Sequence, residues 1–325
     1  MSAAKTLDAL RREIDQIDTE IHELIRRRTK VVETVRDLKK GQPIKIRPAR
    51  EDEILYRLVA EHSGNFPKRE LTRIWRELIV ATLSFEGPFS VAVYGNDDDD
   101  GCRDLARDFY GSYSPMTVFP SARRVIETVQ SHGATLGVLP LPRPDDKEPW
   151  WPHLVGQNED APRVIARLPF AGPGNGRDAN AEAIVICPVD REETGRDRSW
   201  LLIEAEDQPG LTPVVAAMKK AGFSVRFKAN WRDQQAGGPW LYLIEVDGFF
   251  GAQDRAVSRF VEALGSPVNR VVCLGTYGIP LSAEELAPAP EKKPAARSKR
   301  KTVAKPKRAP SSKVKSTPAS RKRRS

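Results

Sequence analysis

Residues 7–38 carry the pattern that most constrains what this chain can fold into. Apolar side chains recur there at alternating spacings of three and four residues for more than four heptads, which is the period of one face of an α-helix. The stripe consists of Leu7, Leu10, Ile14, Ile17, Ile21, Leu24, Val31, Val35 and Leu38. A helix of this length spans about 45–50 Å at 1.5 Å per residue, so its stripe needs a partner of similar length.

The rest of the first 87 residues predicts two shorter helices. The segment 40–48 (KGQPIKIRP) breaks the long helix with one glycine and two prolines. A second helix is expected from about residue 49 to near residue 64, and a third from after Pro67 to Gly87. Because two short helices cannot cover the whole stripe, we predict an intertwined homodimer with twofold symmetry.

After residue 88 the period changes, and three further regions follow. Strands alternate with helices over residues 89–142, which favours an α/β layer with parallel strands. Residues 143–197 are rich in Pro and Gly, with apolar runs only at VIARLPF and AIVICPV. From Trp200 the order is strand, helix, strand, strand, helix, strand, which is typical of an α+β ferredoxin-like unit. The predicted domains are all-α at 1–87, an α/β lobe at 88–197, a ferredoxin-like domain at 198–282 and a tail at 283–325.

The net charge of +9 belongs to the tail. Residues 291–325 contain 15 Lys and Arg and one acidic residue, and taking that +14 from the total leaves −5 for residues 1–290. The tail has no aromatic side chain and only two Val, so it cannot bury enough apolar surface to offset its conformational entropy. We predict that it is disordered. We favour a solubilising or partner-docking tail over one that binds nucleic acid through its phosphates.

Several classes of protein are excluded by composition and spacing. No segment reaches the roughly 18 apolar residues of a membrane span, and the three Cys and four His are scattered without metal-ligand or disulfide spacing. A cytoplasmic protein without a metal or cofactor is expected. The run Asp97–Asp100 is interpreted as a solvated acidic loop, with a metal site as the alternative.

Cations on the long helix suggest a site for an anionic ligand, and for a surface arginine such as Arg11 a solvated side chain is the alternative. Arg28 and Lys39 are three turns apart, so they point the same way and can grip a small anion across about 16 Å. Arg11 lies about 25 Å before Arg28 and roughly 100° around the axis. One helix cannot bring all three to one ligand, whereas an antiparallel partner helix can. Position 28 interrupts the apolar stripe, and a charge there needs a partner.

This arrangement resembles the all-helical chorismate mutase family over residues 5–87, in LDALRREIDQIDTEIHELIRRRTKVVETVRDLK, AREDEIL and LTRIWRELIVATLSFE. The resemblance implies an isomerase that converts chorismate to prephenate in phenylalanine and tyrosine biosynthesis. It implies that Arg11 of the partner chain and Arg28 bind the two carboxylates, and that Lys39 donates to the ether oxygen. The reaction is a pericyclic rearrangement, in which cations stabilise charge that grows on the ether oxygen.

The same resemblance assigns roles to the two shorter helices. Glu51 accepts from the substrate hydroxyl and Arg50 supports the site electrostatically. Thr82 and Glu86 share one helix face and match positions that contact a carboxylate and the ether oxygen. A carboxylate would repel that oxygen, so Glu86 is expected to act only when protonated. Arg47 stands where an acidic residue is more usual.

The middle region resembles the first lobe of prephenate dehydratase, which many bacteria fuse after a chorismate mutase. Its motifs are replaced, however, by Gly95–Gly101 with four aspartates, by Pro140-Leu141-Pro142, and by Ala181-Glu182-Ala183 in place of the motif with the catalytic threonine. Prephenate is a dianion, and four aspartates oppose its binding. We expect a lobe without dehydratase activity, and a bifunctional mutase and dehydratase is the alternative.

The turn DQPG after Glu206 is similar to the Asp-x-Pro-Gly turn of ACT domains, which bind amino acids at paired interfaces. The resemblance implies an effector site for phenylalanine at Asp207, Pro209, Gly210 and Leu211, and a purely dimerising module is the alternative. A nonenzymatic, amino-acid-responsive regulator that binds nucleic acid is a further alternative for the whole chain. Chorismate mutase activity is the function that we expect.

Overall fold

The computed structural model describes residues 6–38, 46–96, 101–156, 161–174, 180–190, 192–235, 237–251, 253–265 and 267–288, without the side chains of residues 84–86. Residues 1–289 form one compact unit. The run Asp97–Asp100 and residues 289–325 of the predicted tail lie outside the described residues. Residues 283–286, which we predicted to belong to the disordered tail, form a short helix capped by Ser282.

Three helices occupy the N-terminal region, as predicted: α1 (Leu7–Leu38), α2 (Pro48–Glu61) and α3 (Lys68–Glu86). Pro48 lies at the first helical position of α2, where its missing N–H is not needed. Helix α2 ends at Glu61, three residues before the predicted end. The residue after it, His62, has an extended backbone and its side chain contacts the Phe66 carbonyl at 2.8 Å.

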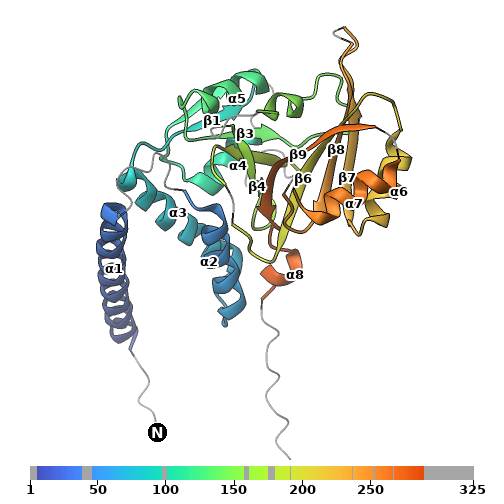
Figure 1. Ribbon diagram of the computed structural model, residues 1–325. Coiled ribbons are helices and arrows are strands. Elements are labelled where there is room, and N and C mark those ends of the chain that lie inside the picture. The colour runs from blue at the N-terminus through green and yellow to red at the C-terminus, as the bar shows by residue number, and fades with distance from the viewer. Residues whose placement is uncertain are drawn as a thin grey trace, which may run out of the picture. The chain divides into compact units, whose positions relative to one another are not determined.

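The remaining chain builds one nine-stranded mixed sheet (Figure 1), in the order β2-β1-β3-β5-β4-β9-β6-β8-β7. The first part alternates β1 (Val91–Tyr94), α4 (Gly101–Tyr110), β2 (Met116–Phe119), α5 (Ala122–Gln130) and β3 (Leu136–Pro140). Strand β1 pairs in parallel with both β2 and β3, as predicted. A short 3-10 helix (Trp151–Leu154), β4 (Arg163–Leu168) and β5 (Ala183–Cys187) follow, and β5 is antiparallel to both β3 and β4.

Helices α4 and α5 cover opposite faces of this part of the sheet. Val91 and Val93 share a core with α4, whereas Ala92 between them shares a core with α5, because successive strand side chains point to opposite faces. The core beneath α4 also contains Leu55 and Val80 of α2 and α3. The N-terminal helices and the middle lobe therefore share one hydrophobic core.

The last part has the predicted βαββαβ order: β6 (Asp197–Ala205), α6 (Leu211–Lys220), β7 (Val225–Trp231), β8 (Trp240–Asp247), α7 (Arg255–Leu264) and β9 (Val268–Gly278). A short helix, α8 (Ala283–Leu286), follows. Helices α6 and α7 lie side by side over one face of these strands (Figure 1). Helix α7 begins at Arg255, because the Asp254 side chain caps it by accepting from the Ala256 N–H at 2.8 Å.

The two sheet regions are continuous, although we predicted a separate four-stranded unit. Strand β9 pairs in parallel with β4 where Gly275 lies opposite Val164. Gly275 has a φ of +137°, and a Cβ there would lie 2.3 Å from the backbone of Val164. Only glycine permits so close an approach. The predicted domain boundaries after residues 87, 197 and 282 stay predictions.

Candidate functional site

Arg28 of α1 meets Thr82 of α3. The half-buried guanidinium donates from Nη1 to the Leu78 carbonyl at 3.3 Å and to Thr82 Oγ1 at 3.4 Å. Thr82 is 8% exposed, and its hydroxyl donates back to the Ile79 carbonyl at 2.7 Å. That bond leaves the oxygen lone pairs available to Arg28. The structure therefore brings together two of the residues predicted to bind substrate.

Burial opposes the charge on Arg28. Desolvation lowers the pKa of its guanidinium below the ordinary value. An arginine pKa starts so high that the side chain keeps its charge near neutral pH. A half-desolvated cation attracts an anionic ligand more strongly than a solvated one does. Arg28 thus has the environment expected of a carboxylate-binding cation.

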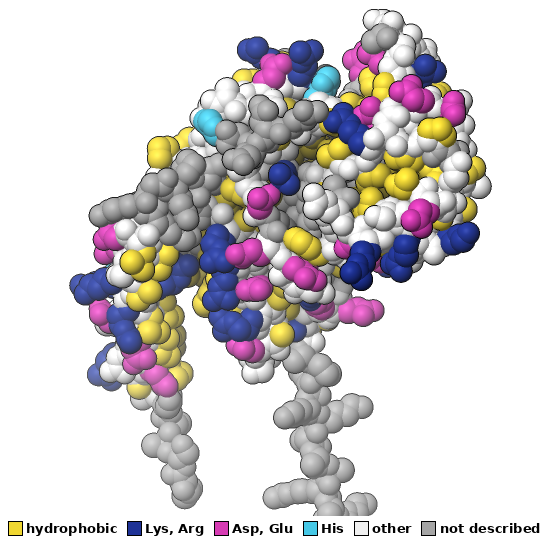
Figure 2. Space-filling model, viewed as in Figure 1, with side chains coloured by type: hydrophobic (Ala, Val, Ile, Leu, Met, Phe, Trp, Pro, Cys, Tyr) yellow, Lys and Arg dark blue, Asp and Glu magenta, His cyan; other side chains and the backbone are white. Residues whose placement is uncertain are grey.

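Arg11 is exposed and forms an ion pair with Asp8 at 3.6 Å. Around it the apolar stripe of α1 is open (Figure 2), and α1 has no buried residue. The stripe residues are between 38% and 83% exposed, from Val35 to Leu38. The predicted contribution of Arg11 from a partner chain stays a prediction.

The start of α2 places its two predicted site residues differently. Arg50 is exposed and pairs with Glu53 at 3.2 Å. Glu51 is 7% exposed, and its Oε2 accepts from Arg76 Nη1 of α3 at 2.7 Å. Its Oε1 accepts from the backbone N–H of Arg47 at 3.3 Å. The Arg47 side chain reaches Glu192 of the middle lobe at 2.7 Å.

Two predicted site residues cannot be compared with the structure. Lys39 lies outside the described residues. Glu86 is the last residue of α3, and its side chain is not described. The roles assigned to both stay predictions.

The segments that replace the dehydratase motifs meet around a cavity of about 160 Å³. The described residues that line it include no hydroxyl side chain. They are Gly101, Cys102, Pro140, Leu141, Pro142, Arg143, Asn180, Ala181 and Glu182. Arg167 binds Glu182 at 2.7 Å, so the cavity's acidic group is already paired.

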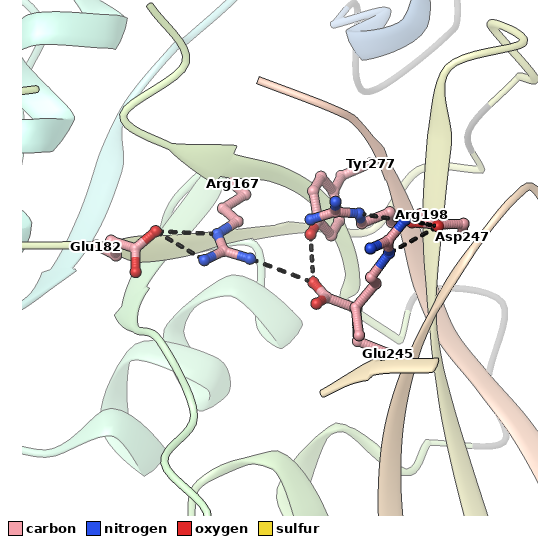
Figure 3. A network of polar contacts seen from close by, with 7 residues as sticks. Arg167, Glu182, Arg198, Glu245, Asp247 and Tyr277 are labelled. Carbon is pink, nitrogen blue, oxygen red and sulfur yellow. Dashed lines mark hydrogen bonds and ion pairs between the residues drawn. The ribbon is translucent and has the colours of Figure 1, made fainter. Parts of the chain in front are cut away.

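Arg167 also belongs to a network between the middle lobe and the last four strands (Figure 3). We call this network the Arg167 cluster, and it comprises Arg167, Glu182, Arg198, Arg226, Glu245, Asp247 and Tyr277. Arg167 Nη1 lies 3.5 Å from Glu245, which is 2% exposed and accepts from the Tyr277 hydroxyl. Burial is the largest cause that raises the pKa of Tyr277. Three arginines face three carboxylates, so the formal charges of the cluster cancel. Its ion pair between Arg167 and Glu245 links the middle lobe to the last four strands.

The predicted effector turn lies at the start of α6. Asp207 is exposed, and Pro209, Gly210 and Leu211 are half-buried. Gly210 has a φ of +81°, which favours glycine, and its N–H donates to the Tyr242 hydroxyl at 3.3 Å. Its role in effector binding stays a prediction.

Arg76 was missed by the sequence analysis. The stripe of the third helix runs through Leu71, Trp75, Leu78 and Ile79, and position 76 falls beside it. The helical period predicts that a charged residue beside the apolar stripe is exposed to solvent, yet Arg76 is 3% exposed. It is buried because α3 packs against α2 and α4 as well as α1, which the helical period alone does not reveal.

Comparison with known proteins agrees with this geometry. Residues 10–87 match the model of the family described as chorismate mutase type II. A bifunctional chorismate mutase/prephenate dehydratase from Aquifex aeolicus is 35% identical over 140 residues, which cover 42% of this chain and 38% of that protein. A second one, from Pseudomonas aeruginosa, is 27% identical over 147 residues, which cover 43% of this chain and 40% of that protein. This chain thus spans about two fifths of the length of these relatives.

Among solved structures, the prephenate dehydratase of Arthrobacter aurescens in complex with L-Phe is similar, with a TM-score of 0.43 and 15% identity. The match covers 62% of this chain and 92% of that one. Described helices include none with the length and apolarity needed to cross a membrane. The family match and the three-helix geometry together identify residues 10–87 as a chorismate mutase type II domain.

Proposed function

We propose that this protein is a homodimeric chorismate mutase that converts chorismate to prephenate. The observation that carries the proposal is the contact of Arg28 with Thr82 across α1 and α3, inside the region that matches the mutase family. A half-desolvated guanidinium held at a helix crossing suits a ligand with two carboxylates. The open stripe on α1 supports a second chain that supplies Arg11.

The rearrangement needs only that the enzyme holds the substrate in the reactive conformer and places positive charge near the ether oxygen. The substrate rearranges through a compact conformer, and negative charge grows on the ether oxygen as the C–O bond breaks. Arg28 and the partner chain's Arg11 fix the carboxylates, and Lys39 and protonated Glu86 donate to the ether oxygen. Glu51 accepts from the hydroxyl group. Each well-placed donor accelerates the reaction by about 10²–10³-fold.

The dehydratase activity is absent in this proposal. The cavity at residues 101–102, 140–143 and 180–182 offers no hydroxyl among its described lining residues, where the resemblance requires a catalytic threonine. A bifunctional enzyme is the second candidate, because relatives from two organisms carry that name.

The βαββαβ part is proposed to be an ACT domain that dimerises and senses phenylalanine at Asp207, Pro209, Gly210 and Leu211. The strand order β9-β6-β8-β7 with two helices on one face supports this. We propose a disordered tail that serves solubility or docking.

Purified full-length protein tests the mutase proposal with chorismate, while prephenate and phenylpyruvate are resolved as products. We expect prephenate alone, and a loss of about 100-fold or more in kcat/KM for Arg28→Ala and Lys39→Ala. Arg27→Ala, an exposed neighbour on α1, is the control and should stay near wild type. Phenylpyruvate from the wild type would favour the bifunctional enzyme, and no turnover would contradict both.

A further inference from the structure

Arg76 is buried where the mutase helices meet the middle lobe. Its side chain is 4% exposed, and its Nε donates to the Phe109 carbonyl of α4 at 2.9 Å. The guanidinium carbon lies 3.8 Å from the centre of the Phe109 ring. Helix α4 ends one residue later, at Tyr110, so this carbonyl belongs to the negative end of the helix dipole. The middle lobe thus supplies two favourable contacts to one arginine.

The same guanidinium holds Glu51. Arg76 Nη1 lies 2.7 Å from Glu51 Oε2, and the Arg47 N–H binds the other carboxylate oxygen at 3.3 Å. An ionised carboxylate accepts about four hydrogen bonds. The described residues make two of these, so within the described part of the chain Glu51 keeps acceptor capacity for a substrate hydroxyl while its orientation is fixed.

A buried ion pair by itself is a weak source of stability, because both charges lose their water. This one is anchored by groups from three helices. Outside the mutase region Arg76 is held mainly by Phe109, and the Tyr110 ring lies 5.3 Å from its guanidinium carbon. The lobe therefore determines where Arg76 stands, and Arg76 determines where the Glu51 carboxylate points.

We propose that Arg76 is a positioning residue for the mutase reaction and that the middle lobe, through Phe109, fixes the orientation of the Glu51 carboxylate. This inference rests on the proposed function. It assigns the lobe a role in the mutase reaction that does not depend on dehydratase chemistry. A purely structural role for Arg76 would change the stability of the protein but not the rate of its folded form.

A double-mutant cycle in the full-length dimer distinguishes these roles. The variants are Glu51→Gln, Arg76→Met and the double variant, each assayed for kcat, KM and urea unfolding. If Arg76 acts through Glu51, each single change lowers kcat by about 10–100-fold, and the double variant is no slower than the slower single variant. KM should change by less than about threefold, because the carboxylate-binding cations are untouched.

Three further variants keep the test decisive if Arg76→Met folds poorly. Arg76→Lys keeps the charge but cannot reach Glu51 and Phe109 together, so it should recover part of the lost kcat. Phe109→Leu keeps the carbonyl and removes the ring, and a fall of about threefold in kcat is expected. Arg73→Met is the matched control, because Arg73 lies three residues earlier on α3, is exposed and pairs with exposed Glu70 at 3.6 Å.

The outcomes separate the two levels of the argument. Suppose that the wild type turns over chorismate. If the rate losses of the two single variants multiply in the double variant, or if folded Arg76 and Phe109 variants are as fast as wild type, the inference is overturned and the proposed function still stands. A wild type without turnover overturns the proposed function, and the inference with it.

Discussion

Helix α1 and strand β6 bury their apolar side chains to opposite extents within one chain. Helix α1 has 32 residues and no buried side chain. Strand β6 has nine residues, of which seven are buried, and it packs against different cores on its two faces. The strand is completed by its own chain, whereas the helix is not. In the proposed homodimer a second copy covers the stripe of α1, whereas the two faces of β6 are covered without it.

Charges placed on the α1 stripe should have the largest effect. Ile17→Glu with Ile21→Glu removes two apolar side chains per chain, each worth about 1.5–3 kcal/mol when buried. We expect monomers at micromolar concentration and a loss of mutase turnover, measured by sedimentation equilibrium and by chorismate consumption. Thr19→Glu adds a charge to the opposite face of α1 and should leave the dimer intact. A double variant that stays dimeric would show that the stripe is not the interface.

Arg28→Ala should lower kcat/KM by about 10²–10³-fold without loss of stability. Burial lowers the pKa of Arg28, which means that the charged side chain is less favourable in the folded state than in water. Removing it should therefore leave the free energy of unfolding constant or raise it. Kinetics with chorismate and urea unfolding measure the two quantities. A fall in the free energy of unfolding that accompanies the fall in kcat/KM would instead identify Arg28 as a residue that stabilises the packing of α1 on α3.

On the strand side of the comparison, the expected loss is in stability. Arg167→Met leaves Glu245 buried without its cation, which should cost about 3–5 kcal/mol. Because the contacts of the Arg167 cluster lie within one chain, the loss should not vary with protein concentration. Arg167→Met combined with Glu245→Gln should recover part of it. Urea unfolding at two protein concentrations checks this, and a concentration-dependent loss would remove the contrast with α1.

The smallest effect is expected at α8. The hydrogen bonds from Arg196 are the largest cause that holds the pKa of Glu285 at about 2, below its ordinary 4.5. The resulting stability is present above pH 4.5 and is lost as the pH falls toward 2. Glu285→Gln keeps the helix cap and removes the charge, so it should cost less than about 1 kcal/mol at pH 7 and nothing near pH 2. A penalty that is equal at both pH values would contradict this pairing.

The sequence predicted the elements well because their periods are local. The stripe of α1, the parallel pairing of β1 with β2 and β3, and the βαββαβ order all follow from spacings within short segments. The continuous sheet was not predicted, because the pairing of β4 with β9 joins residues about 110 positions apart in the chain.

In the candidate site, too, features that depend on local spacing were predicted, and features that depend on distant contacts were not. Arg28 was singled out because it interrupts an apolar stripe, and the structure gives it the partner that such a charge needs. Arg76 and Arg167 gave no such signal, since each is buried by elements distant in sequence. Periodicity shows which face of a helix is apolar, but not which second face a neighbouring domain covers.

Complementation between two inactive chains tests the central claim, a mutase site shared by two copies, most directly. Arg11→Ala and Arg28→Ala proteins are mixed, allowed to exchange subunits and assayed with chorismate. If Arg11 acts across the twofold axis, half of the dimers become heterodimers with one intact site each, and about a quarter of wild-type activity returns. No gain on mixing, with exchange confirmed by mass spectrometry, would contradict the account.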